Sequence, residues 1–132
     1  MAAKEFRYRN KTVEELKKME IKEFAKLVPA RQRRSLTRGF TDPQKRLLAK
    51  VKNANDGKFK KPIKTHCRDL VILPSMIGLM IHIHKGKGYA AVNISEEMVG
   101  HFLGEFAHTR SNVKHSAPGI GATRSSQAAS VK

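Results

Sequence analysis

We predict that this chain is built around the stretch HIHKGKGYAAVNISEEMVGHFLGEFAHTR, residues 82–110. It contains two apolar-rich runs separated by a glycine-containing turn, and this pattern predicts a β-hairpin. Gly86 and Gly88 can adopt the positive φ angles that such a turn requires. After the second run, Ser95 is a favourable helix N-cap, and the two glutamates that follow suit the first turn of a helix. Two further glycines interrupt the apolar spacing, so we expect a helix of only one or two turns.

Basic side chains lie at both ends of this stretch. The hairpin tip carries Lys85 and Lys87, and the end of the stretch carries His108 and Arg110. Leu103 and Phe106 belong to the apolar positions of the last helical element, so we expect both in the core. A small packed unit therefore presents cations at its turn and at its exit.

Two short helices are predicted in the first 30 residues. Thr12 and Glu15 fit a capping box, and a second helical segment spans roughly residues 22–28. These 30 residues hold five acidic and eight basic residues, which is close to balance. Helix faces of mixed charge are usually solvated, so we interpret this part as a helical extension that packs on the domain or on a neighbouring molecule.

A third helix is predicted between Pro29 and Gly39, because proline suits a first helical position and glycine a C-terminal cap. It carries four arginines and no acidic residue: Arg31, Arg33, Arg34 and Arg38. Three of them, at positions 31, 34 and 38, are spaced to share one face. The planar guanidinium group can hold phosphate through two hydrogen bonds. We therefore predict that this helix contacts RNA rather than forming a merely solvated face.

A fourth helix begins at Thr41 or Asp42, since either is a good N-cap, and it ends at residues 55–57. A lysine-rich loop follows, with Lys58, Lys60 and Lys61. Residues 31–64 hold twelve basic and two acidic residues, an excess of ten in a chain of net charge +16. Because we expect the loop beside the arginine-rich helix, we predict that it contacts a nucleic-acid backbone rather than only increasing solubility.

The remaining part of the core is predicted from shorter apolar runs. Residues 63–67 are typical of a strand. Residues 68–73 could form a strand or a buried turn, because their apolar run is short and is ended by Pro74. Together with the hairpin and the helices, these elements indicate an α+β domain.

The composition excludes several classes of protein. With 132 residues the chain has single-domain length, and its net charge of +16 would oppose folding by self-repulsion unless a polyanion compensates it. Aromatic residues make up 6% with no Trp, which fits phosphate contact better than many stacking platforms. A lone cysteine excludes an intrachain disulfide, and we find neither a membrane-spanning run nor a signal-peptide core. We expect a soluble, intracellular protein in a reducing compartment.

Residues 111–132 differ from the rest of the chain. They contain five serines, no aromatic residue, no leucine and no acidic residue. Such a segment cannot bury enough apolar surface to order itself, so we expect a flexible basic tail that folds on its partner or not at all. Its candidate contact residues are Lys114, His115 and Arg124.

No catalytic or metal site emerges from the sequence. His82 and His84 share one face of a strand, but no further His or Cys has the spacing that would complete a zinc site, so we interpret them as surface or RNA-facing imidazoles. Glu96 and Glu97 are explained by helix capping, and Cys67 by a small buried thiol. The run Gly119–Arg124 follows no strand and opens no helix, so it does not predict a nucleotide site. We expect no enzyme activity, no cofactor and no metal.

Several motifs together resemble one protein family. They are the Gly-Lys turn at 86–87, Glu-Glu-Met-Val-Gly-His at 96–101, Leu-Gly-Glu-Phe-Ala-x-Thr at 103–109, Pro-x-Met-x-Gly at 74–78, Pro-Ala-Arg-Gln-Arg-Arg at 29–34 and Pro-Gly-Ile-Gly-Ala-Thr at 118–123. The first four closely resemble the small-subunit ribosomal proteins numbered nineteen, and the last two resemble the archaeal and eukaryotic branch of that family. The resemblance covers about residues 28–126.

The resemblance implies a fold, a location and partners. The fold would be a two-layer α+β domain with a helix and a three-stranded mixed sheet. The protein would bind ribosomal RNA in the head of the small subunit, in the cytoplasm, beside the protein numbered thirteen in bacteria. Its C-terminal tail would approach the decoding site and A-site tRNA. Contacts made by the N-terminal helices cannot be transferred from bacterial relatives, because the sequence departs from the bacterial pattern there.

We therefore divide the chain into a helical N-terminal extension (1–40), an α+β core (41–110) and a flexible basic tail (111–132), and expect no homo-oligomer. The predicted RNA-contact residues are Arg31, Arg33, Arg34, Arg38, Lys58, Lys60, Lys61, Lys64, Arg68, Lys85, Lys87, His108, Arg110, Lys114, His115 and Arg124. An architectural DNA-binding protein would share the charge but should show a groove-reading helix or a symmetric dimer surface, and neither is evident. An RNA-modifying enzyme would need a cofactor or acid–base site that the sequence does not supply.

Overall fold

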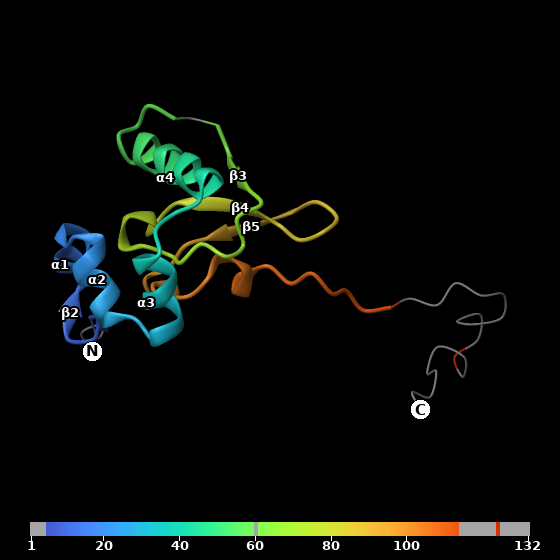
Figure 1. Cartoon of the computed structure of the whole chain (residues 1–132). Coiled ribbons are helices and arrows are strands. Elements are labelled where there is room, and N and C mark those ends of the chain that lie inside the picture. Colours follow the sequence, from blue (N-terminus) through green and yellow to red (C-terminus); the bar gives the residue numbers. More distant parts are fainter. Residues whose placement is uncertain (1–4, 60, 114–123, 125–132) are drawn as a thin grey trace.

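The computed structural model describes residues 5–59, 61–113 and 124. In chain order its elements are β1 (Arg7–Tyr8), β2 (Lys11–Thr12), α1 (Val13–Lys18), α2 (Ile21–Leu27), α3 (Ala30–Thr37), α4 (Asp42–Asn55), β3 (Ile63–Thr65), β4 (Met80–His84) and β5 (Tyr89–Asn93), with 3-10 turns η1 (Pro74–Met76), η2 (Glu96–Met98) and η3 (Leu103–Phe106) (Figure 1). Among the described residues no helix is both long and apolar enough to cross a membrane.

The predicted hairpin forms two strands of a three-stranded mixed sheet. The strand order is β3-β4-β5, with β3 parallel to β4 and β4 antiparallel to β5. The tip turns through Gly86 at φ +95° and Gly88 at φ +87°, and the Lys85 N–H donates to the Gly88 carbonyl at 3.0 Å. The α+β class and the mixed sheet are therefore confirmed.

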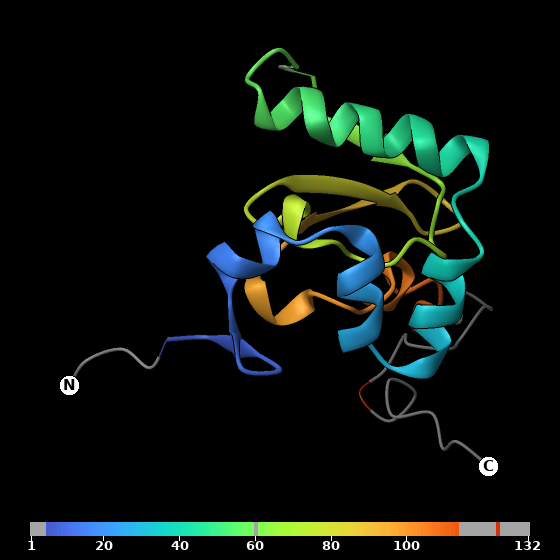
Figure 2. The ribbon, with the colours of Figure 1, turned by 60° about the vertical axis from the view of Figure 1, so that its left-hand side comes forward.

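The sheet has one buried and one exposed face because side chains alternate along each strand. Ile81 and Ile83 of β4 are fully buried, and Ile63 of β3 lies beside them in the core. The 14-residue helix α4 packs against β3 and contributes Leu47 and Val51 to the same core. In Figure 2, α4 runs along the top of the sheet and α1 to α3 lie below it.

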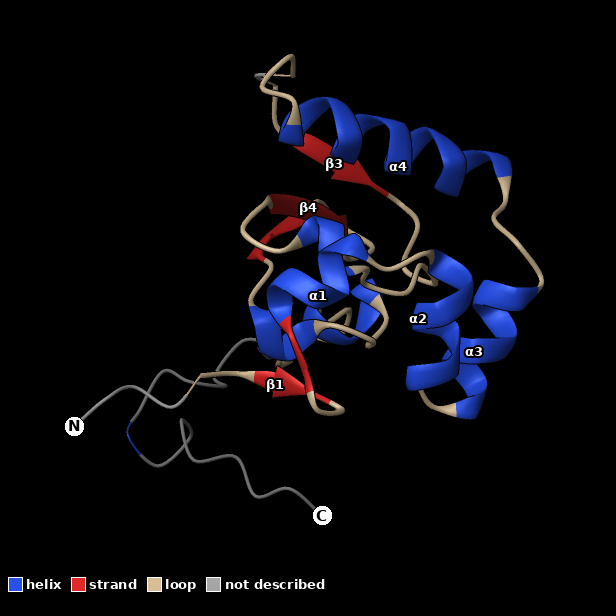
Figure 3. Cartoon of the chain, turned by 90° about the vertical axis from the view of Figure 1, so that its left-hand side faces the viewer, coloured by secondary structure: helices blue, strands red, loops and turns tan. Residues whose placement is uncertain are grey.

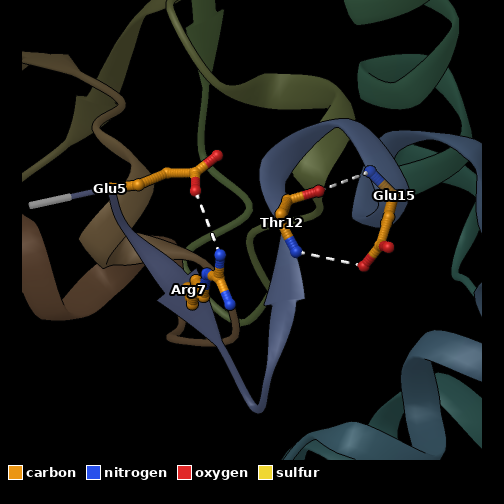
Figure 4. A network of polar contacts seen from close by, with 4 residues as sticks. All are labelled: Glu5, Arg7, Thr12 and Glu15. Carbon is orange, nitrogen blue, oxygen red and sulfur yellow. Dashed lines mark hydrogen bonds and ion pairs between the residues drawn. The ribbon is translucent and has the colours of Figure 1, made fainter.

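The N-terminal helices pack on this core, which answers one question that the sequence left open. Leu16 of α1 and Phe24 of α2 are 1% and 2% exposed and belong to the same buried cluster as Ile81. The predicted capping box is confirmed: the Glu15 N–H donates to Thr12 Oγ1 at 3.4 Å, and the Thr12 N–H donates to Glu15 Oε2 at 3.2 Å (Figure 4). The division of the chain at residues 40 and 110 stays a prediction.

A small hairpin before α1 was not predicted. Strands β1 and β2 pair across a tight turn in which Arg9 and Asn10 have φ angles of +49° and +64° (Figure 3). The sequence carries no glycine at this turn, and glycine is the usual signal for such a conformation. Tyr8, at the start of the turn, packs its ring 6.4 Å from that of Phe24 and so connects the hairpin to the core.

The start of α4 is settled in favour of Thr41. Thr41 is the N-cap, and its N–H donates to Gln44 Oε1 at 3.1 Å. Gln44 is buried, and its Nε2 donates to Asp69 Oδ2 at 3.0 Å, so the cap also connects α4 to the segment after β3. Gly39 has φ +90° just after α3, as expected of a glycine past a helix C-terminus.

The predicted helix after the hairpin is replaced by two 3-10 turns, η2 and η3. Gly100 lies between them at φ +85°, and a Cβ there would come within 2.7 Å of the Tyr8 hydroxyl. The chain at this point pairs with the ambiguous segment 68–73: the Ile72 N–H donates to the His101 carbonyl at 2.7 Å, and the Leu103 N–H donates to the Leu70 carbonyl at 3.0 Å. These backbone hydrogen bonds hold residues 70–72 in extended form and prevent a continuous helix.

Burial in this last element is uneven. Leu103 is fully buried, which confirms its assignment to the core. Phe106 is only partly buried; it packs against the core and lies edge-on to His101, with ring centroids 6.0 Å apart. The prediction for Phe106 is thus correct in direction but overstated in extent.

Candidate RNA-binding surface

All four arginines that the sequence assigns to this helix are exposed: Arg31, Arg33 and Arg34 lie in α3, and Arg38 is its C-terminal cap. Arg31 and Arg38 line a hollow of about 500 Å³ between the end of α3, the start of α4 and the segment around Asp69. The helix itself contains no acidic residue. This end of the molecule therefore presents guanidinium groups around a concave surface that polar and apolar side chains line in about equal measure.

Arg33 is oriented differently from its neighbours on α3. Its Nε donates to the Ala25 carbonyl at 3.2 Å, and its Nη2 donates to the carbonyls of Val28 at 3.2 Å and Lys26 at 3.5 Å. These carbonyls lie at the C-terminal end of α2, where helical hydrogen bonds are missing and a cation is favoured. The geometry gives Arg33 a structural role in joining α2 to α3, and its predicted RNA contact remains untested.

The lysine loop does not lie beside the arginine-rich helix, contrary to our expectation. Helix α4 has 14 residues and separates the two, so the loop begins about 20 Å from the end of α3 (Figure 2). Lys58 and Lys61 are exposed in this loop, and Lys60 lies outside the described residues. The sequence reasoning did not include the intervening cations of α4 in the candidate surface. Four of them are exposed: Lys45, Arg46, Lys50 and Lys52.

Arg68 is the second predicted contact residue with an internal role. Its Nη1 donates to the His84 carbonyl at 2.6 Å, and its Nη2 donates to the carbonyls of Gly104 at 2.8 Å and Ala107 at 2.6 Å. A single guanidinium group thus joins the end of β4 to the end of η3. Backbone carbonyls 16 to 39 residues away accept hydrogen bonds from both of its terminal nitrogens, so the half-buried Arg68 positions the segments that carry other cations.

This connection places the hairpin tip and the chain exit at the same end of the molecule. Lys85 and Lys87 are exposed at the tip, and His108 and Arg110 are exposed just after Ala107. Figure 1 shows the hairpin turn and the segment after η3 projecting to the same side. Arg124 is described as exposed, whereas Lys114 and His115 lie outside the described residues.

Few of the described cations are neutralised within the chain. The described residues form three ion pairs, Arg7–Glu5, Lys45–Asp42 and His101–Glu105, all between exposed side chains. Exposed pairs contribute little to stability. None of them involves the arginines of α3 or the lysines of the hairpin tip. Among the described residues, no group of three or more His, Cys, Asp or Glu side chains is placed to hold a metal ion.

A packed α+β core with exposed cations on α3, on α4 and at the hairpin end has the surface of a nucleic-acid-binding domain. The family model for Ribosomal protein S19 matches residues 34–115. The match covers more than half of the 132 residues, from within α3 to the start of the tail, and the chain therefore belongs to the ribosomal protein S19 family. It is a structural constituent of the small ribosomal subunit and binds ribosomal RNA.

Proposed function

We propose that the protein binds small-subunit ribosomal RNA in the head of the subunit through two separate basic surfaces. The first is the helical surface, which consists of Arg31, Arg34 and Arg38 on α3 with the exposed cations of α4. The second is the hairpin surface, which consists of Lys85, Lys87, His108 and Arg110. The observation that supports this most is that Arg33 and Arg68 donate to backbone carbonyls, whereas none of these cations does so in the described structure.

The charge distribution explains why such a protein would remain on RNA. Each cation that contacts a phosphate releases a condensed counterion, so affinity rises with the number of contacts and falls with salt. Phosphate contacts fix position without reading sequence, and a rigid core is needed to hold them in a defined geometry. The exposed cations here are attached to short helices and to a hairpin whose base Arg68 fixes, which satisfies that requirement.

The family resemblance supports a finer location. We infer that residues 111–132 form a basic tail that extends towards the decoding site and A-site tRNA, with Lys114, His115 and Arg124 as its contacts. We also infer that the core lies beside the head protein numbered thirteen in bacteria, as a single copy in cytoplasmic ribosomes. The loop cations Lys58, Lys60 and Lys61 would then contact RNA at the far end of α4 from the helical surface.

Sedimentation tests this proposal in the assembled particle. Tagged full-length protein should travel with small subunits on a gradient at physiological salt and be released at high salt. A variant with Arg31, Arg34 and Arg38 changed to Glu should stay at the top of the gradient while melting like the unmodified protein. Unmodified protein that sediments away from small subunits, or a triple variant that still sediments with them, would contradict the proposal.

A matched comparison of duplexes addresses DNA binding. The protein should bind A-form RNA duplexes with unpaired loops more tightly than B-form DNA of equal length and charge, because RNA-binding proteins recognise shape and unpaired nucleotides. Equal affinity for both duplexes would favour an architectural DNA-binding protein instead.

A further inference from the structure

The exposed face of the three-stranded sheet carries a cluster of rings that the two basic surfaces do not explain. The cluster consists of His66, which follows β3, with His84 of β4 and Tyr89 of β5. We call it, together with Lys64 of β3, the ring face. Strands β3, β4 and β5 contain no acidic residue. Tyr89 is 36% exposed, and Met80 on the same face is 56% exposed.

The rings are held in a defined geometry. His66 and His84 stack with centroids 4.1 Å apart and planes inclined by 28°. Tyr89 stands edge-on to both, at 5.5 Å from His66 and 5.2 Å from His84. The Tyr89 hydroxyl and His66 Nε2 share a hydrogen bond at 2.8 Å, and the Gly86 N–H donates to His84 Nδ1 at 3.3 Å. Lys64 Nζ lies 5.5 Å from the centre of the tyrosine ring.

The sheet register creates this cluster from residues that are scattered in the sequence. His84 lies directly opposite Tyr89 in the antiparallel pair, and Lys64 lies opposite His82 in the parallel pair. His66 comes two residues after Lys64 and so lies on the same side of the sheet. In the sequence, the one sign of this cluster is the pair His82 and His84, two residues apart in a strand, of which only His84 belongs to it.

The surroundings of the ring face select one class of occupant. Unpaired RNA bases stack on Tyr and His rings, and such recognition accounts for most base-specific contacts of RNA-binding proteins. The flanking charges are Lys64 on the sheet and Lys85 and Lys87 at the adjoining hairpin tip, which suit the phosphates on either side of a stacked base. These rings are flanked by lysines, and the three strands contain no carboxylate, which favours an anionic partner that itself contains rings.

We propose that the ring face binds one unpaired base of RNA by stacking against the His66, His84 and Tyr89 rings, while Lys64 and the tip lysines contact the neighbouring phosphates. This inference rests on the proposed RNA binding and adds to it a subsite that recognises an unpaired nucleotide. The hydrogen bond between Tyr89 and His66 orients the rings before RNA arrives. The base contact is insensitive to salt, whereas the phosphate contacts of the two basic surfaces are not.

Affinity for small-subunit ribosomal RNA, measured over a range of salt with full-length protein, separates these two contributions. Tyr89→Ala should weaken binding about tenfold at every salt concentration, or about 1.4 kcal/mol, and leave the salt slope unchanged. Tyr89→Phe keeps the stacking ring and removes only its hydrogen bond to His66, so it is the matched control, and its affinity should stay within about threefold of that of the unmodified protein. The double variant Lys85→Ala, Lys87→Ala should instead reduce the salt slope by about two contacts.

A spectroscopic measurement tests the ring face without the alanine variant, whose loss of affinity could also come from a folding defect. The chain has two tyrosines and no Trp, so Tyr8→Phe leaves Tyr89 as the only strong fluorophore. A single-stranded oligouridylate should quench this fluorescence, and an RNA duplex of equal length without unpaired bases should not. Equal quenching by both, or by neither, would overturn the proposal.

The outcomes distinguish this inference from the function on which it rests. Unchanged affinity of folded Tyr89→Ala, with steep salt dependence retained, would remove the base subsite and leave the ribosomal RNA binding standing. If every variant kept its RNA affinity but Tyr89→Ala failed to enter small subunits, the ring face would be assigned to a neighbouring protein. That result would overturn the proposal. Absence of ribosomal RNA affinity in the unmodified protein would remove both.

Discussion

The α3 end and the hairpin end of this protein each contain one arginine that bonds to the backbone, together with other cations that do not. At each end one arginine bonds to three backbone carbonyls: Arg33 at the end of α2, and Arg68 between β4 and η3. At each end the other cations are exposed. The ends differ in the range of these bonds, because the partners of Arg33 lie 5 to 8 residues away and those of Arg68 lie 16 to 39 residues away.

A count of basic residues does not show which of their side chains bond to the backbone and which can contact an anion. A run of basic residues predicts an anion-binding surface only for those side chains whose donors are free once the chain has folded. At the α3 end the arginine that bonds to the backbone is Arg33, and its bonds join two helices that are neighbours in the sequence. At the hairpin end such bonds concern the tertiary structure, because Arg68 sets where the tip and the exit lie relative to each other.

The largest effect is expected at Arg68. Arg68→Ala removes three hydrogen bonds from a charged donor and leaves partly buried carbonyls unpaired, so the free energy of unfolding should fall by about 3 kcal/mol or more. Thermal and denaturant unfolding would measure this loss. Lys87→Ala, a nearby exposed cation, is the control and should change stability by less than about 0.5 kcal/mol. A melting temperature equal to that of the control would mean that Arg68 does not hold this end together.

The next largest effect concerns RNA affinity at the helical surface. Changing Arg31, Arg34 and Arg38 together to Ala removes three expected phosphate contacts and should weaken binding on the order of a hundredfold at physiological salt. The slope of log affinity against log salt should fall by about three contacts. Filter binding to small-subunit ribosomal RNA provides both values. Lys22→Ala, an exposed cation on α2, is a control that should leave the slope as it was.

A smaller effect is expected at Arg33. Arg33→Ala should reduce the free energy of unfolding by about 1 kcal/mol, because its three bonds are longer and its side chain is more exposed than that of Arg68. Arg34→Ala, one residue further along α3, should leave stability almost unchanged and lower RNA affinity instead. Finding the opposite pattern in the two variants would show that the structural and the RNA-binding arginine have been interchanged.

Whether a feature of this structure could be predicted from the sequence depends on how far apart in the chain the interacting residues lie. The capping box at Thr12, the hairpin glycines and the end of α4 are local features, and each is confirmed. Residue patterns also predicted the exposed α3 face. The roles of Arg33 and Arg68 required carbonyl positions set by packing, and no spacing rule indicates a donor whose partners lie up to 39 residues away.

The corrected elements have a similar cause. The apolar spacing of residues 98–106 suits a helix, but backbone pairing with residues 70–72 competes successfully for the same hydrogen-bonding groups. The ring face combines β3, β4 and β5, and only the register brings His84 opposite Tyr89. The resemblance to a family supplied the mixed sheet, which the residue patterns alone did not specify.

The smallest effect on stability is expected from the C-terminal segment. Every buried apolar residue of the described core lies between Leu16 and Ala107, so removing residues 114–132 should leave the melting temperature within about 1 °C. Ribosomes carrying the shortened protein should nevertheless misread codons more often, because the segment is proposed to lie near the decoding site. A large fall in melting temperature would show that the segment belongs to the fold, and unchanged decoding would remove its proposed role.

We propose above that exposed cations at both ends hold the protein on RNA by phosphate contact, and the salt dependence of its affinity for ribosomal RNA is the sharpest test of this. Six or more contacts predict that affinity falls by about three orders of magnitude or more between roughly 50 and 200 mM salt. The measurement uses full-length protein and small-subunit ribosomal RNA, with Arg33→Ala as a variant whose slope should match that of the unmodified protein. A shallow slope, equivalent to about one or two contacts, would contradict the account.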